Sequence, residues 1–130
     1  MNETVRAAAD KVAATLTKEA RGPRRNGVFA LWLVARVAAD GVGPHGASPR
    51  AQLRRLDALD RRLSSLSVAP PLRRALIGAL RQFQASDEWD AALVLQQLVA
   101  PAREALGTGV ADAMLAVVRA ARAAPMDGDR

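Results

Sequence analysis

The sequence predicts an all-α protein that folds as a compact bundle of five to six helices. Three observations lead to this expectation. Apolar residues recur every three or four positions along most of the chain, the spacing that places side chains on one face of an α-helix. No segment alternates apolar and polar residues with the period of two that is typical of a strand. Alanine, leucine and arginine, which are abundant, are strong helix formers.

The 130 residues are enough for a single domain, because half of them are hydrophobic and a quarter are charged, as in ordinary globular cores. We expect one helical domain over residues 1–124 and a disordered polar tail over residues 125–130. The absence of cysteine excludes disulfides and thiolate metal ligands. The most apolar stretch is far shorter than the roughly 20 residues of a membrane-spanning helix, and the N-terminus lacks the apolar segment of a secretory signal. We therefore expect a cytoplasmic protein without membrane contact.

The first two expected helices cover residues 3–20 and 27–40. In the first, small and branched apolar side chains form one stripe, and an Arg-Gly-Pro segment ends it. Asn26 is a good N-cap for the second helix, because its side chain can accept from a free backbone N–H. This second helix is apolar nearly all round, which predicts a place in the middle of the bundle. Its Trp32 is therefore predicted to be buried.

The third expected helix begins at a serine–proline pair. The fourth begins after a short non-helical segment that follows the third. Ser48 as N-cap and Pro49 as the first helical residue start the third helix, which runs to about Ser65. Leucines at spacings of three and four form its apolar stripe. The fourth helix covers about residues 71–85 and carries a similar stripe of leucine and phenylalanine.

The last third of the chain predicts two more helices. Ser86 or Asp87 is the expected N-cap of a fifth, highly apolar helix. Pro101 interrupts this helix, because proline lacks a backbone donor and clashes with the preceding turn. We expect a kink there, since the alanine before the proline would be a poor cap for a new helix. Gly107 ends the segment, and the threonine after it caps the last helix, over residues 109–123.

Three features could carry chemistry, and each has a simpler structural interpretation. The segment Gly41–Gly46 matches the spaced glycines of a dinucleotide site, but that motif works only between a strand and a helix, so we expect a plain loop. His45 is the only histidine and has no companion ligands. Asp57 and Asp60 could act as an acid–base pair, but Asp57 and Arg61 have the spacing of a surface ion pair. We expect no enzymatic activity, no cofactor and no bound metal.

Arginine is the strongest functional feature of the sequence. Residues 1–86 carry 15 basic and 6 acidic side chains, whereas residues 87–130 carry 4 basic and 7 acidic ones. The guanidinium group binds phosphate and carboxylate through two parallel hydrogen bonds. The candidate site for nucleic acid or an acidic partner consists of arginines on the third and fourth expected helices, namely Arg50, Arg54, Arg55, Arg61, Arg62, Arg73, Arg74 and Arg81.

Two functions remain open at this point. The first is a non-enzymatic protein-interaction module, either an adaptor or a small subunit of a larger assembly, that binds another protein or a second copy of itself. It is favoured because the apolar helices could bury more surface than one small bundle hides. The alternative is a nucleic-acid-binding protein without sequence specificity, which uses the Arg-rich helical face. Acidic residues among the arginines and the lack of evident exposed aromatic residues weigh against it.

Overall fold

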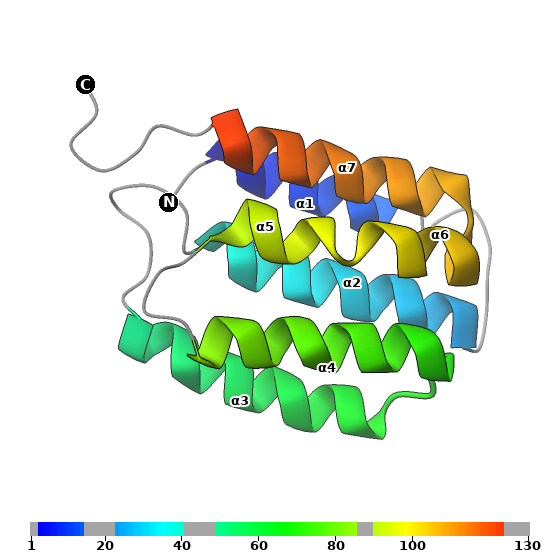
Figure 1. Cartoon of the computed structure of the whole chain (residues 1–130), viewed down its shortest axis with the longest axis horizontal. Helices are drawn as coiled ribbons and strands as arrows, with labels where there is room; N and C mark the ends of the chain where they lie inside the picture. Colours follow the sequence, from blue (N-terminus) through cyan, green and yellow to red (C-terminus); the bar gives the residue numbers. More distant parts are fainter. Residues whose placement is uncertain (1–2, 15–22, 41–48, 86–89, 124–130) are drawn as a thin grey trace.

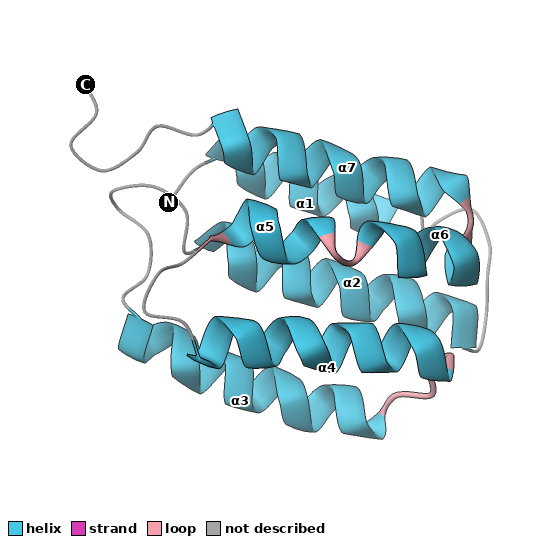
Figure 2. Cartoon of the chain, viewed as in Figure 1, coloured by secondary structure: helices cyan, strands magenta, loops and turns pink. Residues whose placement is uncertain are grey.

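The structure is a computed structural model that describes residues 3–14, 23–40, 49–85 and 90–123. Figure 2 shows this part of the chain as helices joined by short loops, without a strand. The predicted all-α bundle is therefore confirmed. The helical segments are α1 (Glu3–Ala14), α2 (Pro23–Asp40), α3 (Pro49–Ser65), α4 (Pro70–Ala85), α5 (Ala91–Gln96), α6 (Val99–Leu106) and α7 (Thr108–Ala123).

The helices form two layers, and successive helices run in opposite directions except for α5 and α6, which run the same way (Figure 1). One layer consists of α1, α2 and α3, and the other consists of α4, the α5–α6 pair and α7. Across the layers α1 packs on α7, α2 on α5 and α6, and α3 on α4. Because α5 and α6 follow nearly one line (Figure 1), the two layers hold three rods each. None of the described helices is both long enough and apolar enough to cross a membrane.

The central helix α2 contacts all the other helices of the bundle, as its apolar sequence predicts. Leucines and valines from both layers meet between the layers and exclude water there, which is the main stabilising contribution. Gly27 allows α2 to approach its neighbours closely, since a Cβ atom there would lie 3.1 Å from Cδ2 of both Leu72 and Leu106. The largest fully buried side chains are Leu31, Leu56, Leu72, Leu76, Leu80, Leu95, Leu98 and Met114.

The start of α2 differs from the sequence prediction. The helix begins at Pro23 and not after Asn26, because proline has the right φ angle for a first helical residue and lacks only an N–H that has no acceptor there. Asn26 is therefore a residue within the helix and not its N-cap. Its Nδ2 donates to the backbone oxygen of Ser67 at 3.1 Å, which ties α2 to the turn between α3 and α4.

The start of α5 also differs from the prediction. Asp90 is the N-cap, and its Oδ1 accepts from the backbone N–H of Leu93 at 3.0 Å. The predicted caps Ser86 and Asp87 lie outside the described residues. Asp90 satisfies a backbone donor that has no partner within the first turn of the helix. The described helix therefore starts at Ala91.

Pro101 leads to two helices and not to one kinked helix. Before it, the backbone N–H groups of Gln97 and Leu98 bond to oxygens three residues back, at 3.2 and 3.0 Å. A continuous helix would need an N–H at position 101 to reach the oxygen of Gln97, which proline cannot provide, and the ring would clash with that oxygen. Helix α6 restarts at Val99, with Pro101 in its first turn.

The other boundaries agree closely with the sequence. Helix α3 begins at Pro49, and α7 begins at Thr108, one residue before the predicted start. Gly107 lies between α6 and α7 with a φ angle of 99°, a left-handed conformation that glycine adopts at little cost. The predicted tail of residues 125–130 lies outside the described part of the chain, as does the glycine-rich segment of residues 41–46.

Candidate functional site

Three of the predicted site arginines are engaged within the fold. Arg55 forms an ion pair with Asp40, with 2.6 Å between Nη1 and Oδ2. The guanidinium carbon of Arg62 lies 5.1 Å from the ring centroid of Phe29, a cation–π contact. Arg73 donates to the backbone oxygens of Leu63, at 3.0 Å, and of Leu66. These side chains therefore join α3 to α2 and α4.

Four other predicted arginines point into solvent. Arg54 and Arg61 are exposed on α3, and Arg74 and Arg81 are exposed on α4. Each pair is seven residues apart, so each lies along one side of its helix. Arg50 belongs to α3, but its side chain lies outside the described part of the structure. The positions therefore agree with an exposed basic surface over α3 and α4, although only part of the predicted set contributes to it.

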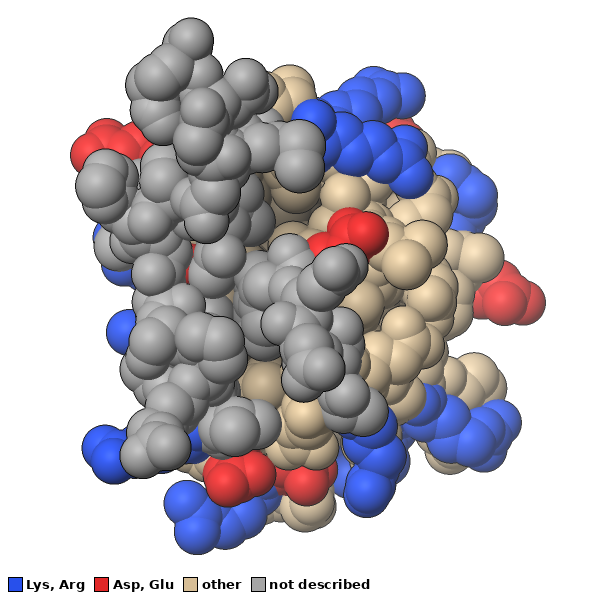
Figure 3. All heavy atoms as spheres, turned by 60° about the vertical axis from the view of Figure 1, so that its left-hand side comes forward, with Lys and Arg blue, Asp and Glu red and all other residues tan. Residues whose placement is uncertain are grey.

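Acidic side chains interrupt this basic surface. Asp57 is exposed on α3, and its Oδ1 accepts from Nε2 of Gln84 at 3.3 Å. The predicted ion pair between Asp57 and Arg61 is not formed, because the carboxylate turns toward α4. Figure 3 shows basic groups along the lower part of the molecule, where α3 and α4 lie, with acidic groups among them. The surface is thus a mixed one and not a continuous positive face.

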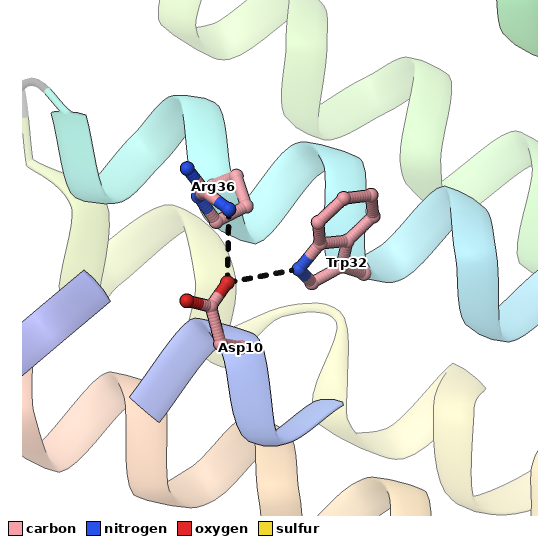
Figure 4. Close-up of polar contacts among 3 residues, drawn as sticks. All are labelled: Asp10, Trp32 and Arg36. Carbon is pink, nitrogen blue, oxygen red and sulfur yellow. Dashed lines mark hydrogen bonds and ion pairs between the residues drawn. The ribbon is translucent and has the colours of Figure 1, made fainter. Parts of the chain in front are cut away.

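A second feature, which the sequence did not predict, lies on the outward side of α2 (Figure 4). Asp10 of α1 accepts two hydrogen bonds through the same oxygen, from Nε1 of Trp32 at 3.2 Å and from Nη1 of Arg36 at 2.9 Å. The guanidinium group of Arg36 also lies over the Trp32 ring, 5.6 Å from its centroid. Asp10 thereby holds the indole and the guanidinium group in one arrangement.

Phe29 extends this feature toward α3. Its ring centroid lies 5.7 Å from that of Trp32, and Arg62 covers it from α3. We call the set Phe29, Trp32, Leu33, Arg36 and Arg62 the aromatic–arginine face. Its four α2 residues are partly buried, and Arg62 is exposed. The prediction that Trp32 is buried is therefore wrong, because α2 is covered by the second layer on only one side.

The spacing along α2 could have shown this face. Arg25 and Arg36 are eleven residues apart, which is close to three helical turns, so they share one side of the helix. Phe29 and Trp32 occupy that same side, since each lies four residues from one of these arginines and seven from the other. Charged residues rarely occupy buried positions, and two arginines in line therefore indicate an outward face even within a highly apolar helix.

Ion pairs neutralise the carboxylates beside the aromatic–arginine face. Asp10 is 51% exposed and pairs with Arg36, and Asp40 is 13% exposed and pairs with Arg55. Nε of Arg36 and Oδ1 of Asp40 are buried without a hydrogen-bond partner, so each ion pair leaves part of its desolvation cost uncompensated. These pairs therefore position side chains more than they stabilise the fold.

The other described residues form no cluster of side chains typical of a catalytic or metal site. A shallow groove of about 490 Å³ lies between α1 and α7, and most of its lining is alanine. No group of three potential metal ligands occurs among the described residues. His45 lies outside them, so the structure does not test its predicted place in a loop.

Comparisons of the chain with protein-family models, with curated protein sequences and with solved structures find no match. Among the described residues, the aromatic–arginine face is the feature with the most specific geometry.

Proposed function

We propose that this protein is a non-enzymatic interaction module, an adaptor or a small subunit of an assembly, that binds a partner protein through the aromatic–arginine face. The observation that carries the proposal is the aromatic pair Phe29 and Trp32, which lies side by side at the surface with a guanidinium group over each ring. Tryptophan and arginine are enriched among the residues that supply most of the binding energy at protein interfaces.

The face also has a fixed arrangement before any partner binds. Trp32 is held by its hydrogen bond to Asp10 and by Arg36 (Figure 4). Phe29 is held between Trp32 and Arg62. Ordering a side chain on binding costs about 0.5–1.5 kcal/mol, and side chains that are already ordered avoid that cost. This order supports a binding role for the face.

Nucleic-acid binding is the second candidate, and the exposed arginines of α3 and α4 favour it. Two observations weigh against it. Exposed Asp57 lies among those arginines, where it would repel phosphate. The rings of Phe29 and Trp32 are already stacked by guanidinium groups, so these faces are not free for bases. A protein partner does not need a continuous positive surface, and its apolar side chains can contact Leu33 and the edges of the rings while the guanidinium groups stay over the ring faces. A cytoplasmic location stays a prediction.

The proposal is tested by selecting helical peptides from a displayed library on the purified protein. We expect enriched peptides that bind the native chain and the control variant Leu93→Ala but not the double variant Phe29→Ala/Leu33→Ala. Leu93 is 56% exposed on α5, in the other layer, so its loss removes a comparable apolar side chain from a different surface. Circular dichroism establishes that each variant is folded. Failure to enrich any peptide, or equal binding to the double variant, contradicts the proposal.

Nucleic-acid binding is measured in parallel by fluorescence anisotropy with labelled single-stranded and duplex DNA. We expect no binding at physiological salt. If the arginines do bind phosphates, affinity for duplex DNA must fall between roughly 50 and 200 mM salt with a log–log slope of about −4 to −5. The double variant Arg54→Ala/Arg61→Ala would then flatten this slope by about two. Light scattering on the protein alone detects self-association, the outcome in which the partner is a second copy.

A further inference from the structure

We propose that the partner presents an acidic amphipathic helix, which lies along α2 with apolar side chains on Phe29 and Leu33 and carboxylates at Arg25 and Arg62. This inference rests on the proposed function, since it assigns a partner chemistry to the same face. It follows from the shape of the face, from its charge, and from the residues that border it on α3.

The secondary structure favours a helical partner. The described part of the chain is helical, so it offers no sheet edge to which an extended peptide could add a strand. Contacts must therefore come from side chains. Arg25, Phe29 and Leu33 follow one another at intervals of four, and this row matches the spacing of side chains along one face of a second helix. From Arg25 to Leu33 the row is about 12 Å long, which corresponds to a little more than two turns of a bound helix.

Helix α3 lies beside this row and carries two arginines on the side that faces it, with a small side chain between them. Arg55 contacts Asp40 and Arg62 contacts Phe29, so both point toward α2. Ala58 lies between them at helical spacing, on the same side of α3, and is exposed. The small side chain of Ala58 leaves space on this side of α3 for an apolar side chain of a partner. The row therefore has an apolar centre with basic groups at its rim.

The basic groups at the rim favour a partner that carries carboxylates. The acidic groups beside the row, Asp10 and Asp40, are already paired with arginines. Arg25 and Arg62 are exposed, and among the described residues no carboxylate lies within ion-pair distance of either. An acidic helix would place carboxylates at these two points and leave the apolar centre covered. A nucleic-acid strand would instead carry phosphates along its whole length, including over Phe29 and Leu33.

The test uses labelled, helix-stabilised peptides in fluorescence anisotropy. The first carries leucines on one face and glutamates along both flanks. The second replaces each glutamate by glutamine, and a third has the composition of the first in scrambled order. We expect the first peptide to bind the native chain about tenfold more tightly than the other two, since two rim ion pairs contribute modestly each.

A charge reversal separates recognition from a structural effect. The double variant Arg25→Glu/Arg62→Glu should lose about tenfold or more in affinity for the glutamate peptide and should bind a lysine–leucine peptide more tightly than the native chain does. The control variant Arg119→Ala, which removes an exposed arginine from α7, should bind the glutamate peptide like the native chain. A loss of binding without the gain for the lysine peptide would overturn the inference.

The outcomes distinguish this inference from the proposed function. Equal binding of the glutamate and glutamine peptides, with loss in Phe29→Ala/Leu33→Ala, overturns the acidic partner and leaves the docking face intact. Equal binding of the scrambled peptide shows attraction by charge alone and overturns the helical register. If single-stranded DNA binds at the same arginines more tightly than the peptides do, both this inference and the proposed function are overturned. Both are also overturned if no peptide binds, including those selected from the library.

Discussion

Arg73 and Arg74 are neighbours in the sequence with the same side chain, but the structure predicts that removal of Arg73 lowers stability much more than removal of Arg74. Arg73 is partly buried and donates to the backbone oxygens of Leu63 and Leu66. These oxygens belong to the last turn of α3 and the residue after the helix, where carbonyls carry a partial negative charge. The oxygen of Leu63 also accepts from the backbone N–H of Leu66 at 3.2 Å. Arg74 is exposed.

The magnitude follows from the number of hydrogen bonds. A hydrogen bond from a charged donor contributes about 1.5–3 kcal/mol, but water can reach this partly buried site and replace some of the loss. We therefore expect Arg73→Ala to lower the free energy of unfolding by about 2 kcal/mol. For 130 residues the unfolding entropy is about 0.27 kcal/mol/K, so Tm falls by about 7 °C. Arg74→Ala should change stability by less than about 0.5 kcal/mol.

The assay is urea unfolding followed by circular dichroism, with the slope of the transition compared among variants. Arg73→Lys should lie between the native protein and Arg73→Ala, since a single ammonium group cannot reproduce the two-pronged geometry. Equal stability of Arg73→Ala and Arg74→Ala would refute the reasoning. If both variants were as stable as the native protein and both weakened DNA binding, Arg73 would be the phosphate contact that the sequence predicted.

Further predictions concern the aromatic–arginine face and the core. Asp10→Ala should lower the free energy of unfolding by about 1 kcal/mol, a value reduced because the carboxylate is partly exposed to solvent. Asp10→Asn should lower it by less, because the amide oxygen still accepts from the indole. Equal losses in the two variants would contradict this prediction. Gly78→Ala should stabilise α4 by about 1 kcal/mol, since nothing lies within 4 Å of the added Cβ atom. Gly27→Ala should lack that gain because of crowding; similar midpoints in urea would refute the difference. Trp32→Ala should lower the free energy of unfolding by about 1–3 kcal/mol. This loss should be smaller than the ~2–5 kcal/mol expected for Leu31→Ala, which removes a fully buried side chain. If calorimetry gave the reverse order, Trp32 would belong to the core.

Most helices could be predicted from the sequence because their determinants are local. The spacing of apolar residues sets which stretches are helical, and it needs only neighbouring positions. Pro49 at the start of α3 and Gly107 before α7 act through their own backbone preferences, and both occupy the predicted places. Pro101 also acts locally, although the helix breaks before the proline because the affected hydrogen bond reaches back four residues.

The positions that sequence reasoning placed wrongly depend on contacts far along the chain. Asn26 has the features of an N-cap, but its amide bonds to Ser67, 41 positions away. Asp57 has the spacing for a pair with Arg61, but its carboxylate accepts from Gln84 of α4. In each case a polar side chain has a possible local partner, but its hydrogen bond goes to a residue far along the chain, in the turn after α3 for Asn26 and on α4 for Asp57. Only the packing of the helices brings that second partner within reach.

The sequence alone determined that this protein is a helical bundle, because hydrophobic periodicity is a local property that burial acts on directly. It also marked α2 as the most apolar helix and arginine as the prominent surface charge. Which side of α2 is covered depends on how the helices pack against one another. Two layers bury the side that faces α5 and α6 and leave Phe29 and Trp32 at the surface beside Asp10 and Arg62. Arginines that are equivalent in sequence therefore differ in role, since a guanidinium group binds whichever carboxylate, carbonyl or ring the neighbouring helix brings to it.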